Sequence, residues 1–181
     1  MILRTAASLS LALLLTACWG SSAPLMPASA MKPVPMTGTW AQITSDGTQS
    51  KVTVYRITVQ GKQAQLEKPG KDGKGWEKSY TLSFDALGKS MYLVQAQSPG
   101  SANPNYVVMQ VAPKARELQL VNPACTEAQA KDWEATRSGS DCNWGDYKTL
   151  RSAALDVARA ALEQPAPGLE VSSIETYVKQ N

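Results

Sequence analysis

The chain has 181 residues, 43% of them hydrophobic and 18% charged, with a formal net charge of +3 and no histidine. This small charge does not indicate nucleic-acid binding, which usually requires a concentrated basic face. The absence of histidine excludes Ser-His-Asp and Cys-His catalysis, and histidine-based zinc sites, within this chain.

The first 17 residues have the pattern of an export signal. Arg4 supplies a positive charge, and the uncharged apolar run Ala6–Leu15 follows it. That run is shorter than the about 20 residues of a membrane span but suits a signal peptide. It ends in Leu15-Thr16-Ala17-Cys18, which resembles the lipobox of bacterial lipoprotein precursors. The alternative is an ordinary secretory signal that a cysteine follows by chance.

The lipoprotein resemblance implies how this end of the chain is processed. Residues 1–17 are removed and the Cys18 thiol takes a diacylglyceryl group, because a thiolate is the nucleophile that accepts the lipid. The new N-terminus is usually acylated as well, and several acyl chains give durable anchoring. In enterobacterial lipoproteins an Asp after the cysteine favours inner-membrane retention. Trp19 therefore implies the periplasmic face of the outer membrane, with surface exposure left open.

Residues 18–36 are rich in proline, serine and alanine. Pro24, Pro27, Pro33 and Pro35 prevent a regular helix and favour an extended chain. We expect this segment to be a tether between the lipid anchor and a folded domain. The alternative is a docking peptide that becomes ordered on a partner.

Residues 37–181 are long enough for a single domain with its own core. Short stretches rich in β-branched and aromatic residues follow one another closely between turn sequences, which predicts strands. This spacing favours a mainly β fold, a small antiparallel barrel or sandwich of about seven to eight strands. The predicted strands are 38–43, 52–59, 64–66, 76–84, 91–96, 106–111, 118–121 and 169–178, unless Ser172-Ser173 caps a short helix in the last of them.

Helical patterns occupy the region near residues 126–163. Thr126 and Gln129 have the spacing of a capping box before a short helix. A longer C-terminal helix is predicted over Tyr147–Glu163, with Asp146 as its N-cap. Its apolar stripe is mostly alanine, so we expect it to lie close against the sheet.

Cys125 and Cys142 are the thiols that remain besides Cys18. An exported chain enters an oxidising compartment, so we expect them to form a disulfide. The bridge would close a loop of 18 residues and stabilise the fold by about 3 kcal/mol. A redox pair or a metal site is less favoured, because the Cys-x-x-Cys spacing that lowers a thiol pKa is absent. We expect no metal and no cofactor.

The two ends of the domain carry short motifs that are found in a known type of small β-barrel. Gly38-Thr39-Trp40 resembles the Gly-x-Trp motif of lipocalins, in which the Trp closes the base of the barrel, and Asn105-Tyr106 partly matches the second motif of that family, Thr-Asp-Tyr. Bacterial lipocalins have a helix after the barrel and a last strand outside it, and residues 150–163 and 169–178 are similar in order. The Cys125–Cys142 insertion and a count of seven barrel strands depart from the pattern.

An incompletely filled barrel interior becomes a ligand pocket. We expect Trp40, Tyr80 and Tyr106 to line such an interior. A cavity of several hundred Å3 would indicate a carrier of small molecules. A packed interior with an exposed apolar patch would instead indicate a protein partner.

These features favour a non-catalytic binding protein of the bacterial envelope, attached to the membrane through acyl groups on Cys18. It would hold an envelope protein or a small apolar molecule in a β-barrel, and no nucleic acid. The alternative is an envelope hydrolase that uses a Ser-Lys pair or carboxylates such as Asp141 and Asp146. A closely placed pair with a perturbed pKa inside a cleft would favour the enzyme.

Overall fold

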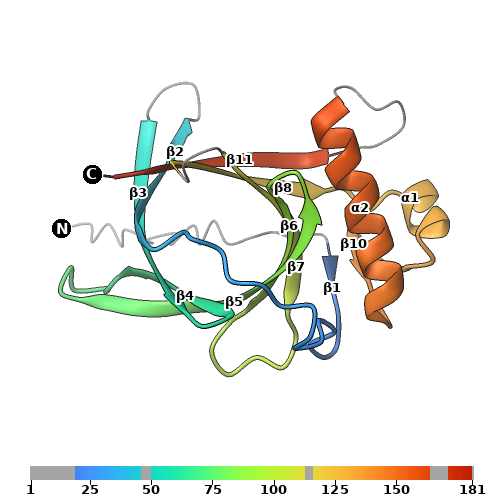
Figure 1. The fold of residues 1–181 in the computed structure, drawn as a ribbon, viewed down its shortest axis with the longest axis horizontal. Helices are drawn as coiled ribbons and strands as arrows, with labels where there is room; N and C mark the ends of the chain where they lie inside the picture. The colour runs from blue at the N-terminus through green and yellow to red at the C-terminus, as the bar shows by residue number, and fades with distance from the viewer. Residues whose placement is uncertain (1–18, 46–49, 113–115, 164–170, 181) are drawn as a thin grey trace, which may run out of the picture.

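The structure is a computed structural model that describes residues 19–45, 50–112, 116–163 and 171–180. The predicted signal peptide and Cys18 lie outside these residues. The described part is mainly β with two helices (Figure 1). Neither of these helices is long and apolar enough to cross a membrane.

An antiparallel barrel forms the centre of the described fold. Its eight strands are β2 (Gly38–Ser45), β3 (Ser50–Gln60), β4 (Gln63–Pro69), β5 (Trp76–Gly88), β6 (Met91–Gln97), β7 (Asn105–Val111), β8 (Glu117–Pro123) and β11 (Val171–Lys179). Hydrogen bonds join them in the order β6-β5-β4-β3-β2-β11-β8-β7, and the pairing of β6 with β7 closes the ring (Figure 1). The mainly β prediction is confirmed, and the fold is the barrel rather than the sandwich.

Strand β11 completes the barrel between β2 and β8. Tyr177 pairs with Gln42 of β2 on one side and with Leu118 of β8 on the other. The prediction of a strand here is confirmed, but the expectation that it lies outside the barrel is wrong. Without β11, the backbone N–H and C=O groups on the facing edges of β2 and β8 would lack partners. Strand β11 forms hydrogen bonds with both edges.

The β3–β4 hairpin shows how the local sequence sets the register of the barrel. Gln60 pairs with Gln63 across the turn. Gly61 between them has a φ of 61°, a left-handed conformation that glycine adopts without steric cost. Strand β5 then follows the period-two pattern and buries the side chains that alternate along one face, Tyr80, Leu82 and Phe84, in the barrel interior.

Residues 19–36 pack against the barrel. Strand β1 (Trp19–Gly20) pairs with β7, and the Lys32 N–H donates to the Phe84 carbonyl at 2.8 Å. The prediction of a free tether is therefore wrong for this stretch, because prolines forbid a helix there but leave apolar side chains free to pack. In Figure 1 the blue segment crosses one end of the barrel between β1 and β2. Its buried apolar side chains are Trp19, Met26, Val34 and Met36.

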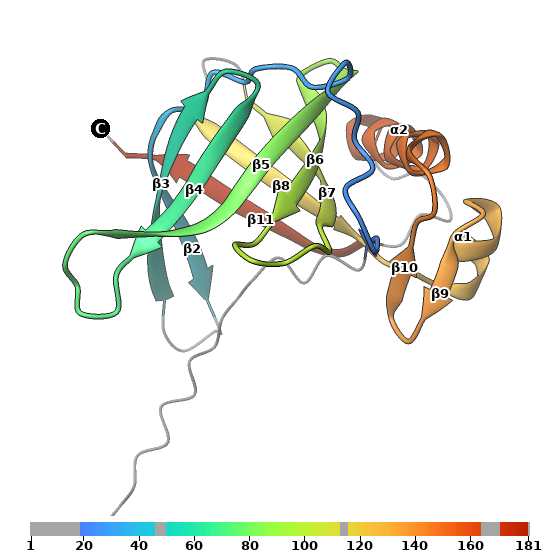
Figure 2. The same cartoon turned by 90° about the horizontal axis from the view of Figure 1, so that it is seen from below.

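A helical module follows β8 on the outside of the barrel (Figure 2). It comprises α1 (Glu127–Asp132), β9 (Thr136–Ser138), β10 (Asp141–Asn143) and α2 (Tyr147–Glu163). The Thr126–Gln129 capping box is confirmed. Asp146 caps α2, as predicted, by accepting the Thr149 N–H at 2.9 Å. The side of α2 that contacts β5, β6 and β7 buries Leu150, Ala153, Ala154, Val157 and Ala158.

Strands β6 and β7 are apolar on both faces, because one core fills the barrel and a second lies between the barrel wall and α2. Val107 and Met109 of β7 belong to the interior core, and Tyr106 and Val108 belong to the outer one. The buried Asp85 ties α2 to β5, since it accepts hydrogen bonds from Arg151 Nε and from the Tyr147 hydroxyl, each at 2.6 Å. These charge-assisted bonds fix the helix against the wall.

Candidate functional site

The barrel interior contains a cavity of about 50 Å3. This volume has room for about three to five water-sized groups. It is smaller than the several hundred Å3 expected of a carrier that encloses its ligand. The cavity is almost entirely apolar, and its wall comes from all eight barrel strands and the segment before β2. The lining residues are Met36, Trp40, Tyr55, Ile57, Leu66, Leu82, Val94, Val107, Met109, Leu118, Leu120 and Tyr177.

Trp40 holds the N-terminal segment against the barrel interior. Its indole Nε1–H donates to the Met36 carbonyl at 2.9 Å, and the side chain is fully buried. The Lys179 ammonium lies 5.8 Å from the centroid of the indole ring, within cation–π range. Gly38 has a φ of 145°, and a Cβ there would meet the Lys179 side chain at 2.7 Å. Glycine suits this position because other residues rarely adopt this φ, whereas the flexible end of the Lys179 side chain could move aside.

A polar cluster lies inside the barrel beside the cavity. The Glu175 carboxylate accepts hydrogen bonds from Gln42 Nε2 at 2.9 Å and from the Tyr177 hydroxyl at 2.7 Å on Oε2, and from Asn122 Nδ2 at 3.3 Å on Oε1. The Tyr55 hydroxyl donates to Gln42 Oε1 at 3.5 Å. Because Tyr55 and Tyr177 also line the cavity, the apolar cavity and this polar group are continuous. We call these five residues the Glu175 cluster.

Among the residues that the structure describes, the carboxylate of the Glu175 cluster has no cation in an ion pair with it. The ion pairs of the described residues are Arg56–Glu67, Arg151–Asp85 and Arg159–Asp156. Burial raises the pKa of Tyr177, and the Glu175 charge raises it further. The same two causes raise the pKa of Tyr55. Both tyrosines therefore stay protonated at neutral pH and act as hydrogen-bond donors, not as bases or nucleophiles.

Replacing Tyr177 by Phe is expected to change how stability depends on pH. The raised pKa means that the folded state keeps the phenol proton where the unfolded state loses it, above about pH 10. The contribution of Tyr177 to the free energy of unfolding is therefore complete below about pH 10, and it is lost as the pH rises above about 10. Urea unfolding should find the wild type more stable by about 1 kcal/mol at pH 8. A difference that stays constant up to pH 11 would contradict this.

Of the three aromatic residues predicted to line the interior, Trp40 alone borders the cavity. Tyr80 is buried in the interior core but is not among the lining residues. Tyr106 lies in the outer core, where its hydroxyl contacts Ser21 Oγ at 3.0 Å and accepts the Leu25 N–H at 3.0 Å. Its placement in the interior is therefore wrong. Both faces of β7 are apolar, so the alternation of the sequence does not reveal which one faces inward.

The Glu175 cluster was missed by reasoning from the sequence. Gln42 and Glu175 are 133 residues apart and meet only because β11 inserts beside β2. One signal was available in the last strand, where Glu175 and Tyr177 alternate with the apolar Ile174 and Val178. That pattern would ordinarily place the apolar residues inside, and closure of the barrel does the reverse.

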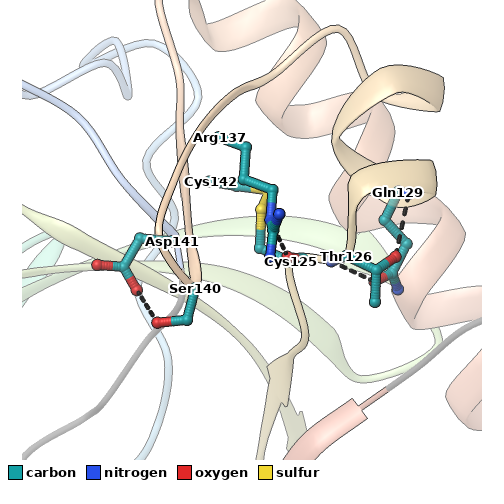
Figure 3. Close-up of a disulfide and its surroundings, with 7 residues drawn as sticks. All are labelled: Cys125, Thr126, Gln129, Arg137, Ser140, Asp141 and Cys142. Carbon is teal, nitrogen blue, oxygen red and sulfur yellow. Dashed lines mark hydrogen bonds between the residues drawn. A yellow bond between two sulfur atoms is a disulfide. The ribbon is translucent and has the colours of Figure 1, made fainter.

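The predicted disulfide between Cys125 and Cys142 is confirmed. Figure 3 shows it between the α1 cap at Thr126 and the β9–β10 hairpin, and Arg137 Nε donates to the Cys125 carbonyl at 3.0 Å. Beside this bridge, Trp19 makes edge contacts with Trp133 and Trp144, with ring centroids 5.2 and 5.1 Å away.

The two carboxylates considered for acid–base chemistry serve separate roles in the structure. Asp141 accepts a hydrogen bond from the neighbouring Ser140 hydroxyl at 3.3 Å (Figure 3). Asp146 caps α2, and the Thr149 N–H lowers its pKa. Both are exposed, so they do not form a buried pair in a cleft. Within the described ranges, no three Cys, Asp or Glu side chains gather as a set of metal ligands.

The cavity and the Glu175 cluster together form one site. Its cavity is apolar, and its Glu175 carboxylate provides a negative charge. Such a site can accept a short apolar group and place a hydrogen-bond donor or a cation near the carboxylate. It offers no activated nucleophile among the described residues. No family model, no curated protein and no solved structure matches the chain.

Proposed function

We propose that this protein is a non-catalytic binding protein of the bacterial envelope, anchored through acyl groups on Cys18 at the periplasmic face of the outer membrane. Its barrel takes up the short apolar end of a small amphipathic ligand. The observation that carries this proposal is the apolar cavity that is continuous with the Glu175 cluster. The cavity of about 50 Å3 is smaller than the several hundred Å3 of a carrier that encloses its ligand, so it supports the insertion of a short group and not the enclosure of a whole molecule.

The size and charge of the site define the ligand more closely. A cavity of about 50 Å3 cannot enclose a lipid acyl chain, so the group inserted there has about three to five heavy atoms. The Glu175 carboxylate favours a primary amine or another hydrogen-bond donor on the remainder of the ligand. We therefore infer a small amphipathic amine as the ligand class.

Native mass spectrometry of the mature protein, extracted from its source membranes in mild detergent, tests this function. We expect an additional small-molecule mass on the wild type, beyond the acyl groups of Cys18. Leu120→Phe fills the cavity from the barrel wall and should abolish that mass. Thr176→Phe adds the same ring on the exposed outer face of β11 and should retain it. Equal ligand occupancy in both variants, or a wild type that carries its acyl groups alone, would contradict the proposal.

A protein partner is the second candidate function, and an exposed apolar surface favours it. Val52 of β3 is 56% exposed, and Ile174 and Val178 of β11 are 58% and 40% exposed. These strands flank β2 in the barrel wall. An exposed apolar surface on a soluble domain is a feature of protein interfaces.

The same extraction separates this second candidate from the first. A partner held by the outer wall would appear as a complex of fixed stoichiometry, and the double variant Ile174→Glu/Val178→Glu should release it. Gln60→Glu, an exposed substitution at the β3–β4 turn, serves as the control. A complex that survives the double variant would contradict binding through this surface.

A further inference from the structure

Trp19, which directly follows the proposed lipidation site Cys18, is buried in the core of the domain. Trp19 is 0% exposed and packs edge-on against Trp133 and Trp144. The same core contains Cys142 of the disulfide. A side chain held on several sides by aromatic rings and the bridge cannot leave this position without opening the core.

The backbone of β1 is held as firmly as the Trp19 side chain. Gly20 pairs with Asn105 of β7, and β1 pairs in parallel with β10 through Trp19 and Cys142. The Trp144 N–H also donates to the Gly20 carbonyl at 2.9 Å. The disulfide joins β10 to Cys125, which follows shortly after β8. The strand that pairs with β1 is therefore covalently linked to the barrel.

We propose that these contacts of β1 hold the domain directly against the membrane, so that the β9–β10 hairpin contacts phospholipid headgroups. This inference depends on the proposed acylation of Cys18. Consecutive Cα atoms are about 3.8 Å apart, so a lipid on Cys18 is attached within one residue of the buried Trp19. A free tether over residues 18–36 would instead allow a root-mean-square separation of about 24 Å. The buried position of Trp19 removes that freedom.

The direction of β1 identifies the surface that meets the bilayer. Parallel strands begin on the same side, so the chain enters β1 on the side where β10 begins, at Asp141 and the hairpin tip Gly139-Ser140. The residues from Thr136 to Asp141 are all exposed. They are polar, and the charges of Arg137 and Asp141 balance. Such a surface suits the headgroup layer of a zwitterionic bilayer and not its hydrocarbon core.

Fluorescence quenching in vesicles tests the docking. The full lipidated protein is reconstituted into phosphatidylcholine vesicles that contain a quencher attached to the headgroups. One sample has a fluorophore at Ser140→Cys in the hairpin, and the matched control has it at Asp72→Cys in the loop between β4 and β5. Figure 2 shows these two loops at opposite sides of the molecule. We expect loss of most of the Ser140 emission and little loss at Asp72.

A linker variant separates docking from simple anchoring. Sixteen Gly and Ser residues inserted between Cys18 and Trp19 allow a root-mean-square separation of about 22 Å and leave the domain unchanged. Quenching at Ser140 should then fall to the level of the Asp72 control. Equal quenching at both sites before the insertion, or unchanged quenching at Ser140 after it, would overturn the inference.

Intact mass measured on the same samples distinguishes the two possible failures. A chain that lacks acyl groups on Cys18 would refute the proposed anchoring, and the docking with it. An acylated chain with equal quenching at Ser140 and Asp72 would refute the docking alone.

Discussion

Replacing Trp19 by Ala is expected to lower the free energy of unfolding by about 3–5 kcal/mol. Trp19 is fully buried between Trp133 and Trp144, so the truncation leaves a cavity that the disulfide-linked hairpin cannot close. Urea unfolding of the purified protein, followed by circular dichroism, measures this loss. A residue in a free tether would give no change, so this variant decides between the two descriptions of residues 19–36.

Two further variants control for the Trp19 result. Trp19→Phe keeps an aromatic ring, and within the described residues the Trp19 Nε1 has no hydrogen-bond partner to lose, so we expect less than half of the effect. Trp76→Ala removes a half-buried indole that lies against Arg56 on the outer wall, with the guanidinium carbon 5.0 Å from the ring centroid. We expect about 1 kcal/mol for that loss. A larger effect at Trp76 than at Trp19 would contradict the packing described for β1.

Removal of the disulfide is expected to have the next largest effect. The double variant Cys125→Ser/Cys142→Ser should lose about 3 kcal/mol, because the 17-residue separation then adds conformational freedom to the unfolded chain. Thermal unfolding under non-reducing conditions measures the difference, which corresponds to a decrease in Tm of about 6–12 °C.

The wild type treated with a reductant provides the matched control for the disulfide. It should unfold at nearly the same temperature as the double variant, while the reductant leaves the double variant unchanged. A double variant as stable as the oxidised wild type would show that packing of the three tryptophans alone holds the hairpin.

Local features of this fold were predictable from short stretches of sequence. The turn at Gly61, the capping box at Thr126 and the cap at Asp146 each depend on residues within four positions of one another. The disulfide was predictable because Cys125 and Cys142 were the two thiols left after the lipobox. The alternation in β5 identified a strand with one face inside the barrel.

Other features depended on contacts between distant parts of the chain. Composition indicated a tether for residues 19–36, but it does not show that the outer wall of β7 provides an apolar surface for Trp19 to pack against. The inward face of β7 was ambiguous for the same reason, since α2 and the N-terminal segment make both of its faces apolar.

The sequence by itself determined the eight barrel strands, the two helices, their caps and the disulfide, but not the short strands β1, β9 and β10, because backbone sterics, side-chain periodicity and thiol chemistry act over short distances. Only the tertiary structure decided that β11 enters the barrel between β2 and β8. That choice satisfies two free strand edges, and it brings Glu175 beside Gln42 and Tyr177 to Tyr55. The candidate site is thus a product of barrel closure, which joins residues that no local pattern connects.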